Sequence, residues 1–245
     1  GLGIYALNSG AVTNNGKITL TGKSVKAIIA DGSAITNSGQ VDVTGTALSA
    51  TDGSDGLVAS NGGTITHTGG GTIAVDGSSS IGALGQNGGT VDITGSTIKA
   101  TGGAFNVFVD GGTVKLNGTT VDTGQKSLAF FATNNGHINF TGPTTANIAG
   151  GTDADTRGTA FYYQGSGYSP FGVSNISSWA GSTFGGTAGQ LTLNMASGSR
   201  LFIASDVSMN LSDTDATALM SQVTTQKPLL TGSTDYKTFM LYLSK

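Results

Sequence analysis

A glycine turn followed by an apolar-x-apolar triplet recurs through the first 150 residues, and its spacing restricts the possible folds more than any other feature. Six copies begin at glycines about 23–26 residues apart, a spacing typical of stacked repeat architectures. These are Gly16, Gly39, Gly63, Gly89, Gly112 and Gly136. We therefore expect these glycines to stack at one corner of a solenoid. The first apolar residue of each triplet should then align inside it: Ile18, Val41, Ile65, Val91, Val114 and Ile138.

Each period contains two further short apolar runs, so three strands are expected per turn. One run follows the triplet, as in Ile73-x-Val75, and another precedes the next glycine turn, as in Val107-Phe108-Val109. Gly-rich and Asn-rich corners separate the runs, and both residue types tolerate the backbone angles of tight bends. Strands this short, with no two-residue hairpin turn between them, must pair with their copies in the next period. The pattern predicts an all-β fold, a right-handed parallel β-helix (β-solenoid) of about 23–26 residues per rung.

Composition agrees with a folded solenoid and excludes some classes of partner. Glycine accounts for 41 of the 245 residues, and all 14 acidic residues are aspartate, which favours turns over helices. A net charge of −3 provides no basic surface for nucleic acid. No run approaches the roughly 18 apolar residues of a membrane helix, so no membrane insertion by this segment is expected. The absence of cysteine is compatible with the cytosol, and equally with a chain that crosses a periplasm unfolded and folds outside.

We expect the whole chain, 1–245, to form a single β-helix segment. In order, the pattern predicts regular rungs in 1–150, an irregular aromatic-rich rung or loop in 151–189, a further rung in 190–211, a short helix in 212–224 and truncated strands in 225–245. The helix is predicted from apolar residues at helical spacing between Ala216 and Val223, and it should cover or connect the solenoid. Neither end carries the polar cap of a natural solenoid, so the chain is expected to be an excerpt of a longer protein.

The aromatic-rich stretch supplies the candidate binding residues. Tyr and Trp are large, rigid and partly polar, and they often dominate contacts with carbohydrate and protein partners. The candidates are Tyr162, Tyr163, Tyr168 and Trp179. The alternative is that these rings pack a wider rung. Asp153-x-Asp155 in the same stretch could contact a cation, but two carboxylates are weak support, and we expect no cofactor and no metal site.

No arrangement of residues in the sequence predicts catalysis. The histidines, His67 and His137, are far apart in the sequence, and no motif places a nucleophile beside a base. The parallel β-helix does host polysaccharide lyases and glycosidases, so a carbohydrate-active enzyme is the alternative. Such enzymes need acids on adjacent rungs, whereas Asp42 and Asp92 are expected two rungs apart on one face, about 9.6 Å from each other.

An ice-binding solenoid is a third class of function to consider. It would need the same Thr-x-Thr pair on every rung of one flat face. The outward residues expected on that face are too mixed: Thr19, Asp42, Thr66, Asp92, Lys115 and Asn139. We therefore expect neither an enzyme nor an ice-binding protein.

The style of the repeats resembles a known family. Runs such as Ala34-Ile-Thr-Asn-Ser-Gly-Gln-Val-Asp-Val-Thr-Gly45 are similar to passenger domains of Gram-negative type V autotransporters, in particular the pertactin-like and large repetitive adhesin branches. The resemblance covers 1–150, and 191–211 is similar to the end of a passenger nearer its membrane anchor. No translocator, signal peptide or serine-protease module accompanies it in this chain.

This resemblance implies a secreted, surface-displayed adhesin or virulence-type stalk that contacts host cells, other cells or glycans. The full-length protein would be anchored in the outer membrane through parts that this chain does not contain. Its partner would be an unidentified surface protein or glycan of a host cell or a bacterium. A purely structural spacer is the remaining alternative.

Overall fold

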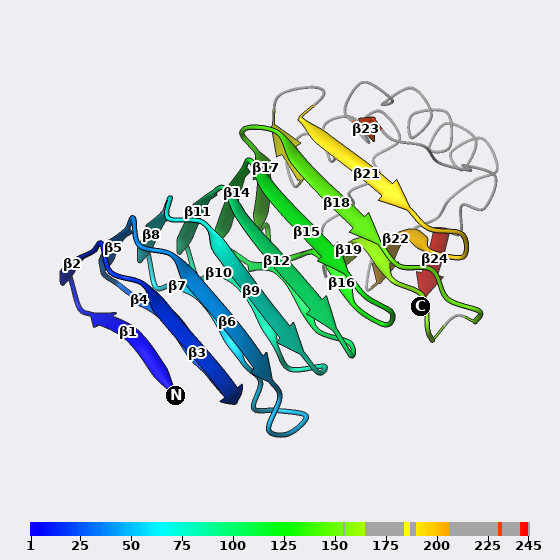
Figure 1. Cartoon of the computed structure of the whole chain (residues 1–245). Helices are drawn as coiled ribbons and strands as arrows, with labels where there is room; N and C mark the ends of the chain where they lie inside the picture. Colours follow the sequence, from blue (N-terminus) through cyan, green and yellow to red (C-terminus); the bar gives the residue numbers. More distant parts are fainter. Residues whose placement is uncertain (154, 165–183, 187–189, 206–229, 232–240, 245) are drawn as a thin grey trace.

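Three parallel β-sheets surround one elongated core in the computed structural model of the chain, which describes residues 1–153, 155–164, 184–186, 190–205, 230–231 and 241–244 (Figure 1). From β1 to β22 successive strands enter sheets A, B and C in turn, and each strand up to β19 pairs with the strand three places further along the chain. Within residues 1–148 this gives six consecutive turns of three strands. The predicted all-β parallel solenoid is confirmed.

The strands are short and their lengths are similar in every turn. Sheet A contains β1 Leu2–Leu7, β4 Lys26–Asp31, β7 Asp55–Ser60, β10 Ile81–Gln86, β13 Phe105–Asp110, β16 Leu128–Thr133, β19 Thr159–Gln164, β22 Arg200–Ser205 and β24 Leu241–Ser244. Sheet B contains β2 Ala11–Asn14, β5 Ala34–Asn37, β8 Thr64–His67, β11 Thr90–Thr94, β14 Thr113–Asn117, β17 His137–Phe140 and β20 Phe184–Gly186. Sheet C contains β3 Ile18–Lys23, β6 Val41–Thr46, β9 Gly71–Asp76, β12 Ser96–Thr101, β15 Thr119–Thr123, β18 Thr144–Ile148, β21 Leu191–Met195 and β23 Leu230–Thr231.

The later part of the chain continues the same sheets. The stretch predicted to be irregular contributes β19 to sheet A and β20 to sheet B, and the predicted further rung contributes β21 and β22. The predicted helix over 212–224 falls outside the described residues. In the ranges that the structure does describe there is no α-helix, and hence none long and apolar enough to cross a membrane.

Aliphatic side chains stacked turn upon turn fill the core. Each sheet contributes inward columns, so a residue in the core rests on its counterparts in the turns before and after. In sheet B the column reads Val12, Ile35, Ile65, Val91, Val114 and Ile138. All but the first of these are essentially inaccessible to solvent. Full burial of each such side chain stabilises the fold by roughly 1.5–3 kcal/mol.

The glycine-anchored triplets do not all occupy one sheet, so the predicted register is wrong at its start. Ile18 and Val41 are partners in sheet C, whereas Ile65 continues a sheet B column that begins with Val12 and Ile35. The glycines divide in the same way. Gly16 and Gly39 stack at the corner between sheets B and C, and a Cβ on Gly39 would collide with the Gly16 carbonyl oxygen. Gly63, Gly89, Gly112 and Gly136 stack at the corner between sheets A and B.

A longer corner at residues 47–54 explains the shift between sheets. This corner joins β6 to β7, whereas only residues 77–80 join β9 to β10 one turn later. The step from Ile35 to Ile65 is therefore longer than each of the next steps of that column, to Val91, Val114 and Ile138. Leu48 projects from this loop with 58% of its surface exposed. Residues 47–54 form the protruding corner at the bottom of Figure 1.

Removing the extra residues of this corner, Leu48–Thr51, should leave the fold intact. The cost of closing a loop changes slowly with its length, so we expect the free energy of unfolding to change by less than about 1 kcal/mol. Deleting Thr97–Ala100 from β12 instead should abolish the cooperative transition. Thermal denaturation followed by circular dichroism measures both. A large loss of stability on deleting the loop would show that this corner holds neighbouring turns together.

A polar ladder runs inside the first three turns, where sheet B meets sheet C. Asn14, Asn37 and His67 occupy equivalent inward positions, and the last two are fully buried. The Asn14 side-chain amide donates to Asn37 Oδ1 at 2.5 Å and to the Gly16 carbonyl at 2.7 Å. Asn37 repeats both contacts, with His67 Nδ1 at 2.8 Å and the Gly39 carbonyl at 2.6 Å. Every buried amide of the ladder is thus partnered, as burial of polar groups requires.

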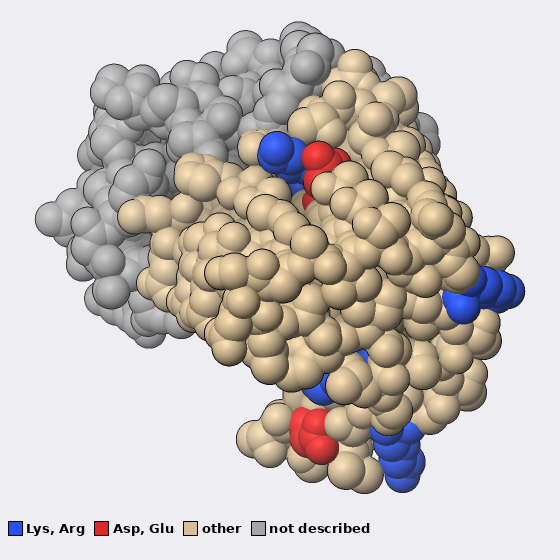
Figure 2. Space-filling model, turned by 90° about the vertical axis from the view of Figure 1, so that its left-hand side faces the viewer, with Lys and Arg blue, Asp and Glu red and all other residues tan. Residues whose placement is uncertain are grey.

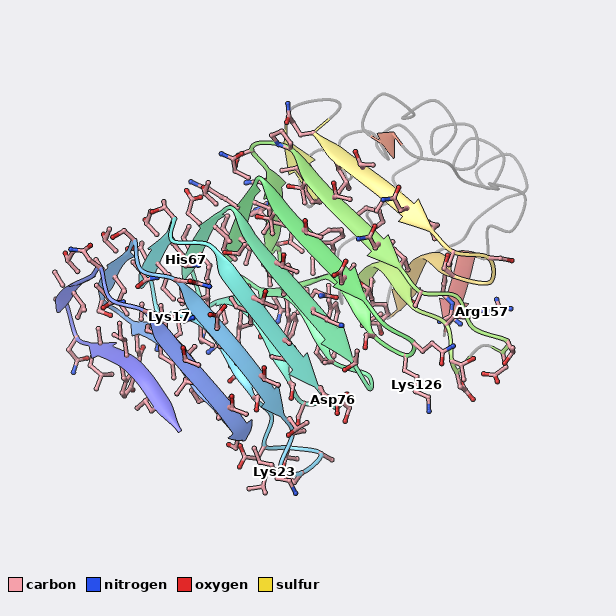
Figure 3. The ribbon with its side chains drawn as sticks, viewed as in Figure 1. Lys17, Lys23, His67, Asp76, Lys126 and Arg157 are labelled. Carbon is pink, nitrogen blue, oxygen red and sulfur yellow. The ribbon has the colours of Figure 1, made fainter. Side chains whose placement is uncertain are left out.

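The ladder also determines which ring nitrogen of His67 carries the proton. Because the Asn37 amide is a donor, His67 Nδ1 must accept, and the proton lies on Nε2, which faces the Gly70 carbonyl at 3.2 Å. Burial lowers the pKa of His67 below its ordinary value. His67 is therefore a neutral, structural residue of the interior. Lys23, Asp76 and Lys126 lie elsewhere, along the corner between sheets C and A (Figure 3).

Candidate functional site

Of the four aromatic candidates, only Tyr162 has a side chain that the structure describes. Tyr162 and Tyr163 are neighbouring residues of β19. Tyr162 is in register with Phe131 on the outer face. Tyr163 is in register with the buried Ala132, and its side chain lies outside what the structure describes, as do Tyr168 and Trp179.

Tyr162 belongs to an apolar column on the outside of sheet A, which we call the sheet A ladder. Its members are Tyr5, Ile29, Val58, Leu84, Phe108, Phe131 and Tyr162, each in register with the next. Each follows a residue of the interior column directly, as Phe131 follows the fully buried Phe130. The ladder is therefore a second apolar stack, separate from the core, along seven consecutive turns.

The rings of the sheet A ladder shield one another. Phe108 and Phe131 stack with their centroids 4.5 Å apart, and the Tyr162 ring centroid lies 4.5 Å from that of Phe131. Phe105, on the same face, is 5.5 Å from Phe131. As a result only 7% of Phe131 is exposed, although it points away from the core. The packing of its ring on Phe131 gives Tyr162 a structural role. The ring is also partly exposed, so it offers a surface for contact with a partner.

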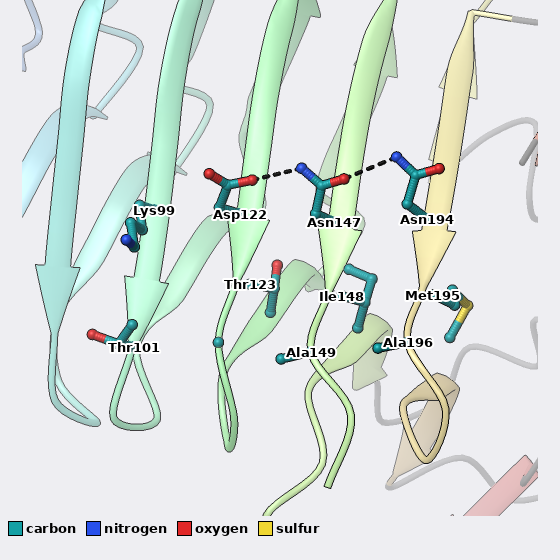
Figure 4. Close-up of a pocket in the computed structure, with 11 residues that line it drawn as sticks. Lys99, Thr101, Asp122, Thr123, Asn147, Ile148, Ala149, Asn194, Met195 and Ala196 are labelled. Atoms are coloured by element: carbon teal, nitrogen blue, oxygen red, sulfur yellow. Dashed lines mark hydrogen bonds between the residues drawn. The ribbon is translucent and has the colours of Figure 1, made fainter.

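The second candidate surface is a shallow groove of about 540 Å³ on the outer side of sheet C, which we call the sheet C groove (Figure 4). Strands β12, β15, β18 and β21 form its floor, so it extends over four adjacent strands. Its lining residues are Lys99, Thr101, Asp122, Thr123, Gly124, Asn147, Ile148, Ala149, Asn194, Met195 and Ala196. Polar side chains line its upper part, and the apolar Ile148, Met195 and the two alanines line the part near the strand ends.

Amide side chains in the sheet C groove are held in a fixed row. Asn194 donates to Asn147 Oδ1 at 2.9 Å, and Asn147 donates to Asp122 Oδ1 at 2.7 Å. Lys99 occupies the equivalent position on the preceding strand. Each amide donates one of its two N–H groups within the row, and the second N–H group of each makes no hydrogen bond to another described residue and can serve a ligand. The row therefore presents donors and acceptors about 4.8 Å apart, already oriented before anything binds.

A column of threonines runs beside this row. Thr97, Thr120, Thr145 and Thr192 align on successive strands of sheet C, and the column starts one strand earlier at Thr72. The outward face expected from the sequence is therefore wrong, because it mixes residues of two sheets. Asp42 lies on β6 in sheet C and Asp92 on β11 in sheet B, so the two acids share no face. The paired threonines of an ice-binding face are still missing, since the adjacent column contains Ala74, Lys99, Asp122 and asparagines.

The residues of the sheet C groove are not among those predicted from the sequence, although a signal for them exists. The threonine directly before the inward residue recurs as Thr72-Ile73, Thr97-Ile98, Thr120-Val121 and Thr145-Ala146. These pairs return at nearly equal intervals, which follow the period of sheet C. Aligning the chain on these pairs places Lys99, Asp122 and Asn147 in one column without any structure.

Asp153 and Asp155 lie in a turn that the Asp153 side chain closes. Asp153 Oδ1 accepts the backbone N–H of Asp155 and of Thr156, both at 3.0 Å. Hydrogen bonding, above all from the Thr156 side chain, holds the pKa of Asp153 below its ordinary value. Across the described residues no group of three or more histidines or carboxylates lies close enough to hold a metal ion. The carboxylate of Asp153 closes its own loop.

The sheet C groove also lacks a pair of carboxylates in the part of the chain that the structure describes. Among its lining residues Asp122 is the one acid, with Lys99 on one side and Asn147 on the other. Glycoside hydrolysis generally needs two carboxyl groups that face each other across the scissile bond. The groove therefore has the chemistry of hydrogen bonding and packing.

Comparison of the chain with models of protein families, with curated proteins and with solved structures finds no match in any of the three.

Proposed function

We propose that this chain is part of a surface-displayed autotransporter passenger of a Gram-negative bacterium, acting as an adhesin or virulence-type stalk. It would contact a protein or glycan on host cells or on other cells. The observation that carries the proposal is the stacking of similar turns into a rod whose outer faces bear continuous columns of one kind of side chain. Six turns at about 4.8 Å each already extend roughly 29 Å, and such a rod holds contact surfaces away from the membrane.

The way in which the turns hold together supports secretion as an unfolded chain. Each strand pairs only with its counterparts in the neighbouring turns, so folding can start in one turn and propagate along the rod. No disulfide has to form, because the chain has no cysteine. Charged side chains are few and scattered on the face shown in Figure 2, which is seen from the end that contains β1 and β2. Such a surface suits contact through hydrogen bonds and packing.

Display on cells tests the proposal. The chain would be fused to a secretion signal and an autotransporter translocator and expressed in a non-adherent Gram-negative strain. We expect protease-accessible chain at the surface and adhesion to epithelial cells or to immobilised glycans well above the level of cells that carry the translocator alone. Folded chain at the surface without any gain in adhesion would contradict an adhesive role and would favour the alternative of a purely structural spacer.

The same cells show whether the ring of Tyr162 takes part in contact. Tyr162→Ala removes a ring that packs on Phe131, and Tyr162→Phe keeps that ring. If the sheet A ladder makes contact, adhesion falls severalfold in Tyr162→Ala and persists in Tyr162→Phe, while the melting temperature of the purified alanine variant stays within a few degrees of the parent. A loss of adhesion that follows a loss of folding would show that Tyr162 only packs.

A further inference from the structure

We infer that the sheet C groove binds an extended, uncharged β-linked polysaccharide that lies along the solenoid axis, with about one sugar unit on each turn. This inference rests on the proposed function, since it names the ligand class of a surface that an adhesin would use. It is carried by three properties of the groove, namely its repeat, its hydrogen-bonding groups and its charge.

The threonine column and the sheet C groove beside it together repeat the same pair of outward positions on successive strands of sheet C. A threonine hydroxyl comes first, from Thr97, Thr120 and Thr145. Two residues later comes a longer polar side chain, from Lys99, Asp122, Asn147 and Asn194. The repeat is about 4.8 Å, close to the length of one sugar ring in an extended chain. A ligand with a similar repeat can make equivalent contacts on every turn.

The hydrogen-bonding groups match neighbouring hydroxyls of a sugar. Asn194, Asn147 and Asp122 already hold one another through bonds of 2.9 and 2.7 Å, so their remaining N–H groups and oxygens point in fixed directions. A hydroxyl both donates and accepts, and the row offers both kinds of partner on adjacent turns. Because the row is ordered before binding, a ligand loses little free energy in fixing it. Ala149, Met195 and Ala196, which are exposed or partly exposed, add an apolar surface against which the C–H side of a sugar ring can pack.

Charge and backbone geometry exclude two other kinds of ligand. Lys99 and Asp122, on neighbouring strands, give the groove no net charge, and a single lysine does not attract a nucleic acid or a sulfated polymer. A peptide that adds a strand needs a free sheet edge. The groove lies on a sheet face, where the backbone groups of β15 and β18 are engaged in ladders on both sides. An uncharged polymer of hydroxyl-bearing rings fits what remains.

The experiment uses the purified chain and an immobilised panel of β-1,4-linked oligomers of glucose, N-acetylglucosamine, mannose and xylose, from two to six units long. α-1,4-linked glucose hexamer serves as a control of equal composition and curved shape, and heparin as a charged control. We expect saturable binding to at least one β-linked series, with affinity that rises with length up to about four units and then levels off. No saturable binding to any β-linked series, or preference for heparin or the curved hexamer, overturns the inference.

Two variants and a matched control locate the site. Asn147→Ala removes the central amide, and Thr145→Val removes a hydroxyl from the same strand while keeping a good strand former. Each should weaken binding at least tenfold. Asn139→Ala, in the same turn but on the outer face of sheet B, should bind as the parent does. Equal binding by all three variants would mean that the sugar lies elsewhere.

The outcome also separates this inference from the proposed function. If cells that display the Asn147→Ala chain adhere as strongly as cells that display the parent, the adhesive role stands, but the sheet C groove does not make the adhesive contact. If the purified chain binds the oligomers as expected but cells that display it do not adhere, the groove stands as a binding site and the adhesive role is excluded.

Discussion

A Val114→Asp variant is expected to lose several kcal/mol of folding free energy, the largest effect that any single substitution discussed for this chain should have. Val114 is fully buried in the sheet B column, between Val91 and Ile138. Every atom around the new carboxylate would be apolar or already hydrogen-bonded backbone, and an unpaired buried charge is among the most costly substitutions known. Because each turn contacts only the turns next to it, disruption of the turn that contains Val114 should also separate the folding of the turns before it from that of the turns after it.

Lys115 provides the control, since it is the next residue of the same strand and points outward from sheet B. Lys115→Ser should change the free energy of unfolding by less than about 0.5 kcal/mol. Chemical denaturation of both variants, followed by circular dichroism, gives the comparison. Equal losses at the two positions would show that β14 does not alternate between core and solvent as described.

This inside-outside alternation is the part of the fold that the sequence predicts best. Short strands with period-2 patterning identify buried and exposed residues without knowledge of which sheet they belong to, because alternation is a local property. Val91, Val114 and Ile138 are thus placed correctly relative to one another. The apolar runs that precede the glycine turn are also predicted correctly as strands, and Val107 does lie in one column of sheet A with residues of the neighbouring turns.

The assignment of strands to sheets does not follow from the triplets alone. Strands of sheets B and C both follow a glycine and both carry Thr or Asp between two apolar residues, as in β6 and β11. A motif shared by two sheets is ambiguous as soon as one corner changes its length. The corner at 47–54 makes that change, and the interval between Gly39 and Gly63 then looks like one more period although it joins different corners.

The same ambiguity conceals the candidate surfaces. Functional columns on a solenoid are defined by register, so an error of one sheet mixes residues of two faces, as it does for Asp42 and Asp92. The aromatic residues stand out because of their density in sequence, which is a local signal. The stacking of Tyr162 on Phe131 depends on pairing between turns, and no local pattern predicts it.

Acidification is expected to destabilise the chain through His67, and a His67→Asn variant should remove that sensitivity. The ring is buried, and its neighbours in the adjacent turns, Asn37 and Ile93, are both uncharged. Burial lowers its pKa in the folded chain below the ordinary value of 6.5. The unfolded chain therefore takes up a proton first as the pH falls. Above about pH 6.5 the ring is neutral in both states and its contribution to stability is complete. As the pH falls from there to the pKa of His67 in the folded chain, this contribution is lost by up to about 1.4 kcal/mol per pH unit.

The polar ladder of Asn14, Asn37 and His67 indicates why asparagine is the substitution to use at position 67. Asn14 and Asn37 each donate to a carbonyl two residues ahead, Gly16 and Gly39, and an asparagine at 67 would find the Gly69 carbonyl in the same place. Its side-chain oxygen would accept from the Asn37 amide as His67 Nδ1 does now. The variant keeps the buried hydrogen bonds and has no group that titrates near neutral pH. His67→Ala, by contrast, leaves the Asn37 amide without this acceptor and should cost about 1–3 kcal/mol at every pH.

Urea denaturation between pH 7.5 and 5.5 measures the effect. We expect the free energy of unfolding of the parent to decline below about pH 6.5 relative to that of His67→Asn, whose curve should stay flatter across the same range. A His137→Asn variant retains His67 and should therefore decline as the parent does. Parallel curves for the parent and His67→Asn would mean that the interior of the solenoid accommodates the protonated ring, and the assignment of a neutral His67 that accepts from Asn37 would be wrong.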